Sequence, residues 1–302
     1  MARVRIIVLL SLLFPALCAT DAYAAPFDEI VVFGDSLSDN GNLVFFEGQP
    51  APDPDLYWQG RLSNGPVWVE YLAGSDLLDA PLKNRAFGGA ETRSLIPPGL
   101  VEQLILHALD DDPPFSPDTL FIVWIGGNDY LNSDRLAQDV VNDIESVLND
   151  LARFGARHLL VLNLPDLGVI PENINSPDAA PATAFTLEYN AALGSMLDRF
   201  STAHPAVALY EFDAYGLSLA VANNPAAFGF LDATQPSPNF EEAGNFDGGG
   251  SVFWDDKHPT TQMHALLADR VYASLNEQMA GPGEAESAGS SSCFIGASRW
   301  GI

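Results

Sequence analysis

Five short runs of the chain are apolar or rich in β-branched residues, and stretches with helical periodicity separate them. The runs are residues 30–33, 82–87, 120–125, 158–164 and 207–212. Continuous apolar runs of this length indicate strands that are buried on both faces. Their alternation with helical patterns is typical of an α/β domain, in which helices cover both faces of a mainly parallel five-stranded sheet.

The helical patterns are clearest in residues 134–154, because their apolar side chains fall on one stripe and Gly155 ends the pattern. The stripe comprises Leu136, Val140, Val141, Ile144, Val147, Leu148 and Leu151. We expect helices over residues 66–73, 100–109, 134–154, 181–200 and 261–279.

Two long segments, residues 45–63 and 223–252, interrupt the alternation and are rich in Pro, Gly or Asn. Segments this long without regular structure are usually functional or disordered, so we expect them to build a ligand pocket. Phe45, Phe46, Tyr57 and Trp58 lie in the first segment, where they line that pocket or pack the loop. Both interpretations remain open at this point.

The two ends of the chain differ from its centre. A basic start, an apolar run over residues 6–17 and the triplet Ala22-Tyr23-Ala24 are typical of a secretory signal. The run is shorter than the roughly 20 residues of a membrane span. We expect a signal peptide over residues 1–24, one folded domain over 25–280 and a disordered Gly/Ser-rich tail over 281–302.

The expected location is therefore the bacterial periplasm or the medium. Cys18 lies in the leader, which leaves Cys293 as the only cysteine of the processed chain and excludes an internal disulfide. The chain has 13 basic and 40 acidic residues, a formal charge of −27. That charge argues against binding to nucleic acid or to an anionic membrane, since both need a basic surface. A solvated acidic surface and adaptation to salt both fit it.

Polar residues follow three of the expected strands. The first strand ends in Gly34-Asp35-Ser36, the second leads to the block 84–90, and the third ends in Gly126-Gly127-Asn128-Asp129. The carboxyl ends of parallel strands lie at one edge of a sheet, where ligands bind. We therefore expect these groups to meet, with Asp35 stabilising the turn rather than reacting.

His258 follows Asp255 by three residues in a loop rich in polar residues. A single turn lets the carboxylate of Asp255 orient the imidazole, which then serves as a base for the hydroxyl of Ser36. Ser36, Asp255 and His258 are thus the candidate catalytic residues. The other histidines (His107, His158, His204 and His264) are expected to be structural or exposed. The sequence has no motif for a metal or a cofactor, and none is expected.

The sequence thus contains four blocks: Gly34-Asp35-Ser36, residues 84–90, residues 126–129 and the stretch from Asp255 to His258. These blocks occur in the order found in the GDSL or SGNH family of serine esterases and lipases, and the chain resembles the phospholipase, lecithinase and haemolysin-like branch of that family. The resemblance runs from Asp28 to about Gln278. It implies a three-layer α/β/α, flavodoxin-like fold. It also implies that the Ser36 N–H, the Gly89 N–H and the Asn128 side chain form an oxyanion hole.

The function implied is hydrolysis of carboxylic esters, with a small-molecule or lipid ester as substrate, and we expect this ester to be a lipid or a phospholipid. A polysaccharide O-deacetylase is the alternative within the enzymes. A catalytically silent binding or adhesion module is the alternative from another class. Activity on acetyl esters alone would favour the first alternative, and failure of Ser36 to react with a fluorophosphonate would favour the second.

Overall fold

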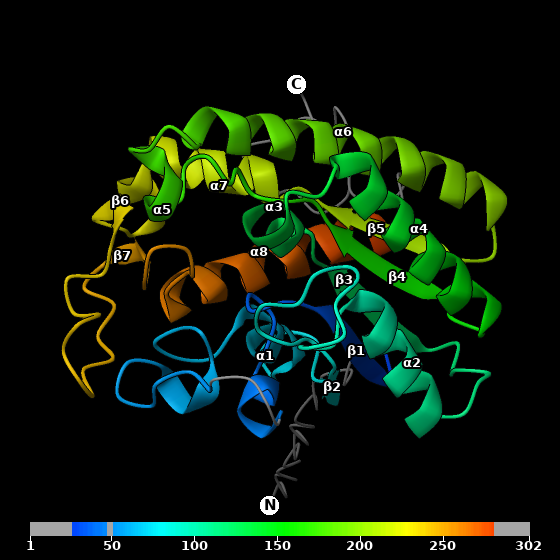
Figure 1. Cartoon of the computed structure of the whole chain (residues 1–302). Helices are drawn as coiled ribbons and strands as arrows, with labels where there is room; N and C mark the ends of the chain where they lie inside the picture. Colours follow the sequence, from blue (N-terminus) through cyan, green and yellow to red (C-terminus); the bar gives the residue numbers. More distant parts are fainter. Residues whose placement is uncertain (1–25, 47–50, 281–302) are drawn as a thin grey trace, which may run out of the picture.

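A five-stranded parallel sheet organises residues 26–46 and 51–280, which the computed structural model describes (Figure 1). Its strand order is β2-β1-β3-β4-β5, and every pair of neighbours is parallel. The strands are β1 (Glu29–Gly34), β2 (Leu82–Asn84), β3 (Thr119–Trp124), β4 (His158–Leu162) and β5 (Ala208–Phe212). The five expected strands and the α/β class are therefore confirmed, and the order is that of flavodoxin-like folds.

Both faces of the sheet are buried, as the continuous apolar runs predict. Alternate side chains of a strand point to opposite faces. Val31 and Phe33 of β1 therefore pack on one side, while Ile30 and Val32 pack on the other. The same alternation holds along β3 and β4, so each face needs its own cover of helices.

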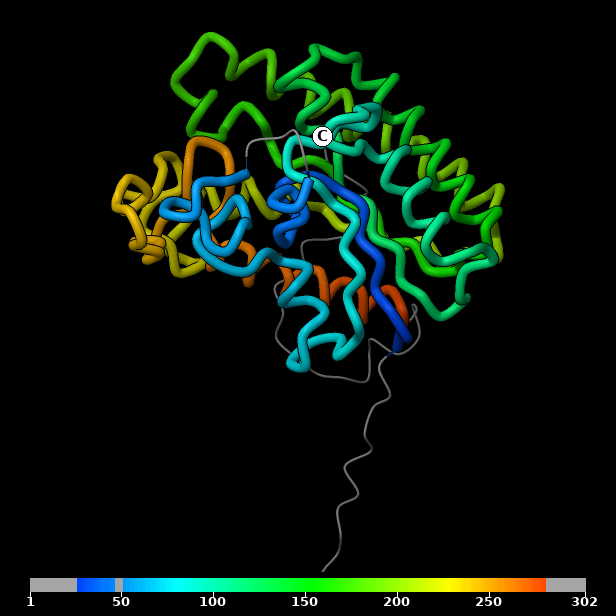
Figure 2. The backbone as a smooth tube through the Cα atoms, turned by 60° about the horizontal axis from the view of Figure 1, so that its bottom comes forward, coloured from blue at the N-terminus to red at the C-terminus, as the bar shows by residue number. Residues whose placement is uncertain are grey.

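The helices form two layers, one on each face of the sheet (Figure 2). The first layer contains α2 (Leu100–Asp110), α4 (Ala137–Arg153) and α6 (Ala179–Ala203). The second contains α1 (Trp68–Ala73), α8 (Thr261–Ala280) and the start of α7 (Ala214–Asn223). The three-layer α/β/α arrangement is confirmed.

The expected helix over residues 134–154 is wrong at its start. The chain instead forms α3 (Gly127–Ser133), breaks at Asp134, whose φ is 49°, and begins again as α4 at Ala137. Leu136 lies before α4 and is 69% exposed, so it does not belong to the buried stripe. The short helix α5 (Pro171–Ile174) and helix α7 had no counterpart among the expected helices.

The second long segment contains more structure than its composition predicts. It holds the 3₁₀ turn η3 (Pro225–Phe228) and the strands β6 (Asp232–Pro236) and β7 (Ser251–Phe253), which pair with each other. Phe230 and Val252 pack with α7 in a small third cluster. The first segment has only the 3₁₀ turns η1 (Asn42–Phe45) and η2 (Trp58–Gly60) in its described part.

The order of the strands fixes where polar groups from distant parts of the chain meet. From β1 the chain crosses to β2 on one side, whereas β3, β4 and β5 lie on the other side. The carboxyl ends of β1 and β3 thus flank the switch point, where α/β sheets bind ligands. Gly34 is needed here, because a Cβ on it would lie 2.7 Å from the carbonyl oxygen of Trp124.

Two expected regions, the signal peptide over residues 1–24 and the tail over residues 281–302, lie outside the described residues. Within residues 26–46 and 51–280, no helix combines the length and the apolar character that crossing a bilayer requires.

Candidate active site

Ser36, His258 and Asp255 form a hydrogen-bonded chain at the carboxyl edge of the sheet. The Oγ atom of Ser36 lies 2.9 Å from Nε2 of His258, and Nδ1 of His258 lies 2.7 Å from Oδ2 of Asp255. All three residues are less than 10% exposed. This is the order of contacts in which a carboxylate orients an imidazole and the imidazole accepts the hydroxyl proton.

A tight turn directly after β1 carries Ser36. The N–H groups of Ser38 and Asp39 both donate to the carbonyl of Asp35, and the Asp35 side chain accepts the N–H of Leu37 at 3.0 Å. Asp35 thus makes the contacts that a turn-stabilising residue makes. Burial is the main cause that raises its pKa to about 7, although the bond from Leu37 and the charge of His258 oppose that rise.

The loop before α8 holds Asp255 and His258. Oδ1 of Asp255 accepts the N–H groups of Lys257 and His258, at 2.9 and 2.6 Å. Burial alone would raise the pKa of Asp255, but the charge and hydrogen bonds of His258 outweigh it and hold that pKa below its usual value. Asp255 is therefore a carboxylate at neutral pH, as an orienting residue must be.

Asn128 comes from the first turn of α3, directly after β3. Its Nδ2 donates to the carbonyl of Ala90 at 3.0 Å, and the residue lines the same cavity as Ser36 and His258. An amide nitrogen carries two hydrogens, so one N–H remains for a ligand. Gly126 permits this bend, because its φ is 125° and a Cβ would lie 2.8 Å from the ring of Tyr189.

Gly89 belongs to a loop that is hydrogen-bonded to the residues that follow Ser36. Its φ of 76° is in the left-handed region that favours glycine. Asp39, which is 1% exposed, accepts the N–H of the preceding Gly88 at 2.8 Å and those of Gly41, Asn42 and Leu43. Asn42 donates to the carbonyls of Asn84 and Ala86. The turn that carries Ser36 and the Gly89 loop are therefore one hydrogen-bonded unit.

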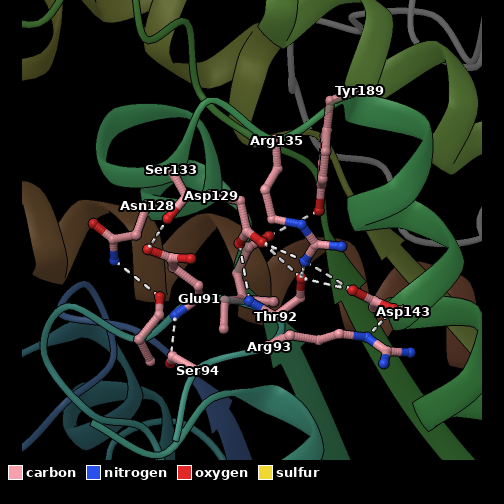
Figure 3. Close-up of polar contacts among 12 residues, drawn as sticks. Glu91, Thr92, Arg93, Ser94, Asn128, Asp129, Ser133, Arg135, Asp143 and Tyr189 are labelled. Carbon is pink, nitrogen blue, oxygen red and sulfur yellow. Dashed lines mark hydrogen bonds and ion pairs between the residues drawn. The ribbon is translucent and has the colours of Figure 1, made fainter. Parts of the chain in front are cut away.

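A buried ionic network lies next to Asn128 (Figure 3). Asp129 is fully buried and accepts the N–H and the hydroxyl of Thr92, at 2.9 and 2.6 Å. Arg135 contacts Asp129 at 3.0 Å and Asp143 at 2.8 Å, and Arg93 contacts Asp143 at 2.6 Å. Burial raises the pKa of Asp129, while Thr92 and Arg135 oppose that rise. The network joins the loop after Gly89 to the start of α3.

An apolar cavity of about 120 Å³ opens at Ser36 and His258. Its walls come from the loop after β4, from α7 and α8, and from β6 and β7. Apolar members of the lining include Leu167, Ile170, Leu217, Val221, Val252 and Leu267. The expectation that the two long segments build the pocket is thus half right, because the second segment lines it and the described part of the first does not.

The aromatic residues of the first segment have other contacts. The Tyr57 hydroxyl donates to Oδ2 of Asp255 at 2.7 Å, a contact that sequence reasoning missed. Phe46 packs against Phe87, and Trp58 lies under the guanidinium of Arg61. Phe45 is 86% exposed. The loop-packing interpretation therefore holds for Phe46 and Trp58, whereas Tyr57 contacts the candidate site itself.

The four other histidines lie outside the hydrogen-bonded chain of Ser36. His158 contacts the hydroxyl of Tyr210, His204 contacts Asn149, and His107 packs against Phe33. His264 is buried and lines the cavity, and burial and the charge of His258 lower its pKa to about 3. It is neutral at working pH, in keeping with a structural role. In residues 26–46 and 51–280, no cluster of His, Cys, Asp or Glu is arranged to hold a metal ion.

Comparison with known proteins gives a consistent relationship. Residues 30–271 match the model of the GDSL-like Lipase/Acylhydrolase family. The chain is 30% identical to a phosphatidylcholine-sterol acyltransferase of Aeromonas hydrophila, over 89% of this chain and 96% of that protein. It is 29% identical to a thermolabile hemolysin of Vibrio parahaemolyticus, over 82% of this chain and 64% of that protein. It is 28% identical to an acetylesterase of Thermothelomyces thermophilus, over 80% of this chain and 86% of that protein.

The ionic network generates a prediction about stability. Arg135→Gln removes the cation shared by Asp129 and Asp143, and we expect the free energy of unfolding to fall by about 3 kcal/mol, as for a broken buried pair. Arg135 opposes the rise in the pKa of Asp129, so its removal should raise that pKa further. A carboxyl group with a raised pKa in the folded state lowers stability at pH values above that pKa, and this loss of stability disappears as the pH falls through it. The loss should therefore be larger at pH 8 than at pH 5, as measured by urea unfolding.

The matched control is Arg153→Gln, whose pair with Asp150 is largely exposed. Exposed pairs contribute about 0–1 kcal/mol, so this variant should unfold almost as the wild type does at both pH values. Equal losses in the two variants, or a larger loss at pH 5, would contradict the role given to Arg135.

Proposed function

Because the chain belongs to the GDSL-like lipase/acylhydrolase family and is a carboxylic ester hydrolase, we propose that it cleaves lipid acyl esters through an acyl-enzyme on Ser36. The observation that carries the proposal is the 2.9 Å contact between Ser36 Oγ and His258 Nε2, two residues that line an apolar cavity. A reactive hydroxyl there faces a space suited to a hydrocarbon chain rather than to a sugar.

The proposed first step forms the acyl-enzyme. Ser36 Oγ attacks the ester carbonyl carbon while Nε2 of His258 takes the hydroxyl proton, and the carbonyl electrons move onto the oxygen. The C–O bond to the alcohol then breaks, and the alcohol leaves with the proton from His258. Asp255 stabilises the imidazolium that forms in between.

The second step releases the acyl group. A water molecule attacks the acyl carbon, gives its proton to His258, and the bond to Ser36 Oγ breaks as His258 returns that proton to the serine. In both steps the carbonyl oxygen carries negative charge. The free N–H of Asn128 and the backbone N–H groups of Ser36 and Gly89 are the donors proposed to stabilise it.

The cavity is the basis for assigning the substrate class. Apolar side chains dominate its lining. Its volume of about 120 Å³ is several times the roughly 10–15 Å³ that a cavity needs to hold one water molecule. Transfer of each methylene from water into such a site contributes about 0.8 kcal/mol. A longer acyl chain should therefore bind more tightly until the cavity is full.

A series of p-nitrophenyl esters from acetate to palmitate tests this proposal. We expect kcat/KM to rise with chain length, and Ser36→Ala to lose activity on every ester. Ala222→Trp adds a large ring at the cavity wall and should lower the ratio of long-chain to acetate activity by about tenfold or more, through lost methylene burial.

Ala191→Trp, at an exposed position on α6, is the matched control and should keep the wild-type ratio. Activity confined to acetate would sink the lipid assignment and support the deacetylase alternative, which the acetylesterase relative makes the natural competitor. A folded protein that cleaves none of these esters and does not react with a fluorophosphonate would support the silent binding module.

The oxyanion role of Asn128 has its own prediction. Removing one such donor costs about 10²–10³ in kcat, so Asn128→Ala should lose activity to that extent while its KM changes little. Because Asn128 Nδ2 also bonds the Ala90 carbonyl, thermal unfolding of the variant must be measured alongside. A folded Asn128→Ala enzyme with near-normal kcat rules out the role.

We further propose that the protein is exported. The support is the pattern of residues 1–24, in which a basic start, an apolar run and Ala22-Tyr23-Ala24 follow one another. Expression in a bacterium should yield protein in the periplasm or the medium. Its N-terminal sequence should begin at Ala25, and an intact Met1 on cytoplasmic protein would contradict the proposal.

A further inference from the structure

Tyr57 reaches the candidate active site from an irregular segment almost 200 residues away along the chain. Its hydroxyl donates to Oδ2 of Asp255 at 2.7 Å. The same oxygen atom accepts the hydrogen bond from Nδ1 of His258, also at 2.7 Å. The other carboxylate oxygen, Oδ1, is occupied by the N–H groups of Lys257 and His258. Among residues 26–46 and 51–280, Asp255 thus has four donors, and Tyr57 is the only one of them from outside its own loop.

We propose that Tyr57 is a positioning residue for the acid–base pair: its hydroxyl fixes the Asp255 carboxylate and moderates the attraction of Oδ2 for His258. The inference rests on the proposed function of Ser36, His258 and Asp255. It adds to them a residue that touches neither the substrate nor the reacting atoms, and that acts through Asp255 alone.

The segment around Tyr57 is held firmly enough to perform this role. The indole N–H of Trp254 donates to the carbonyl of Leu56 at 2.9 Å, and the N–H of Gly244 donates to the carbonyl of Asp55 at 2.7 Å. The ring of Tyr57 packs edge-on against Phe240, which packs in turn against Trp254. Trp254 directly precedes Asp255, so the contacts that fix Tyr57 also fix the residue it bonds.

Further along the same segment, two more residues bind the loop that carries His258. Ser63 Oγ donates to the carbonyl of Pro259 at 2.8 Å, and the Asn64 side chain accepts the N–H of Thr261 at 2.8 Å. The chain on the far side of Tyr57 is therefore attached to residues that follow His258. Little side-chain freedom remains to be lost when the Tyr57 hydroxyl binds Asp255.

The electrostatics fix the direction of this hydrogen bond. Burial, and then the negative charge of Asp255, raise the pKa of Tyr57 well above its usual value. Tyr57 therefore keeps its proton wherever Asp255 is ionised, and it acts as the donor. A neutral donor stabilises the carboxylate without adding a charge, and it shares Oδ2 with the imidazole.

Tyr57→Phe tests the inference, because it removes only the hydroxyl and keeps the ring that packs against Phe240. Loss of one net hydrogen bond corresponds to roughly threefold to tenfold in rate, and we expect kcat to fall by that factor with KM nearly unchanged. Oδ2 then binds His258 alone and holds the imidazolium more strongly. The acid limb of the kcat/KM profile should therefore move upward by roughly half a pH unit.

Other charged groups near Asp255 and His258 must stay the same when Tyr57→Phe is compared with the wild type. Asp35 and His264 interact with His258, and Asp256 and Glu241 face Tyr57. Lys257 follows Asp256 in the same loop and pairs with Glu172. Asp35 has a pKa of about 7 and interacts with His258 through its charge, so its own protonation also enters the pH profile. The shift caused by Tyr57→Phe should therefore persist when both enzymes also carry Asp35→Asn.

The matched control is Tyr210→Phe. The Tyr210 hydroxyl also contacts a histidine, His158 at 3.2 Å, in a partly buried position on β5 and outside the cavity that Ser36 lines. This variant should keep the wild-type kcat and pH profile. Thermal unfolding of both variants identifies any general loss of stability.

A second readout needs no knowledge of the natural ester. A fluorophosphonate reacts with Ser36 by forming an O–P bond while the P–F bond breaks, with fluoride leaving and the serine proton passing to His258. The second-order rate constant of inactivation should show the same upward shift of its acid limb in Tyr57→Phe. An unchanged acid limb, with or without a lower melting temperature, would overturn the positioning role. If instead Ser36→Ala were labelled as fast as the wild type, the proposed function itself would fail.

Discussion

A sheet that is buried on both faces has one place where polar groups can converge, and the site depends on that constraint. The faces of this sheet are filled by apolar side chains from two layers of helices. Because all five strands are parallel, their carboxyl ends lie at one edge. Ser36 follows β1, Asn128 follows β3, and the loop before α8 brings His258 to the same edge.

The convergence places several carboxyl groups in surroundings that water scarcely reaches. Each one is accommodated by specific donors. Asp39 accepts four backbone N–H groups, Asp129 accepts two bonds from Thr92, and Asp255 accepts the bonds of its own loop and of Tyr57. A buried charge without such partners destabilises a fold strongly. These bonds also connect the blocks to one another, so they order the site as they stabilise it.

The part of the candidate site that holds Asp255 and His258 and the part that holds Ser36 are built differently. Ser36, Gly89 and Asn128 lie directly after strands or in a loop bonded to one, which gives them a rigid support. His258 and Asp255 lie in a loop that contacts both long segments, and side-chain bonds and aromatic contacts hold this loop in place. The two long segments therefore support the candidate site, and the second also forms part of the cavity wall.

The sequence by itself determined the five strands of the parallel sheet, the α/β class and the candidate residues, because these follow from local patterns. Apolar runs mark the strands, Gly34-Asp35-Ser36 and Gly127-Asn128 follow two of these runs, and Asp255 precedes His258 by three residues. Two features depended on tertiary structure: the contact of Tyr57 with Asp255 and the source of the cavity walls. Both result from contacts between residues far apart in sequence. Tyr57 and Asp255 are separated by 198 positions, and no local pattern in the chain relates them before the fold brings them within 2.7 Å.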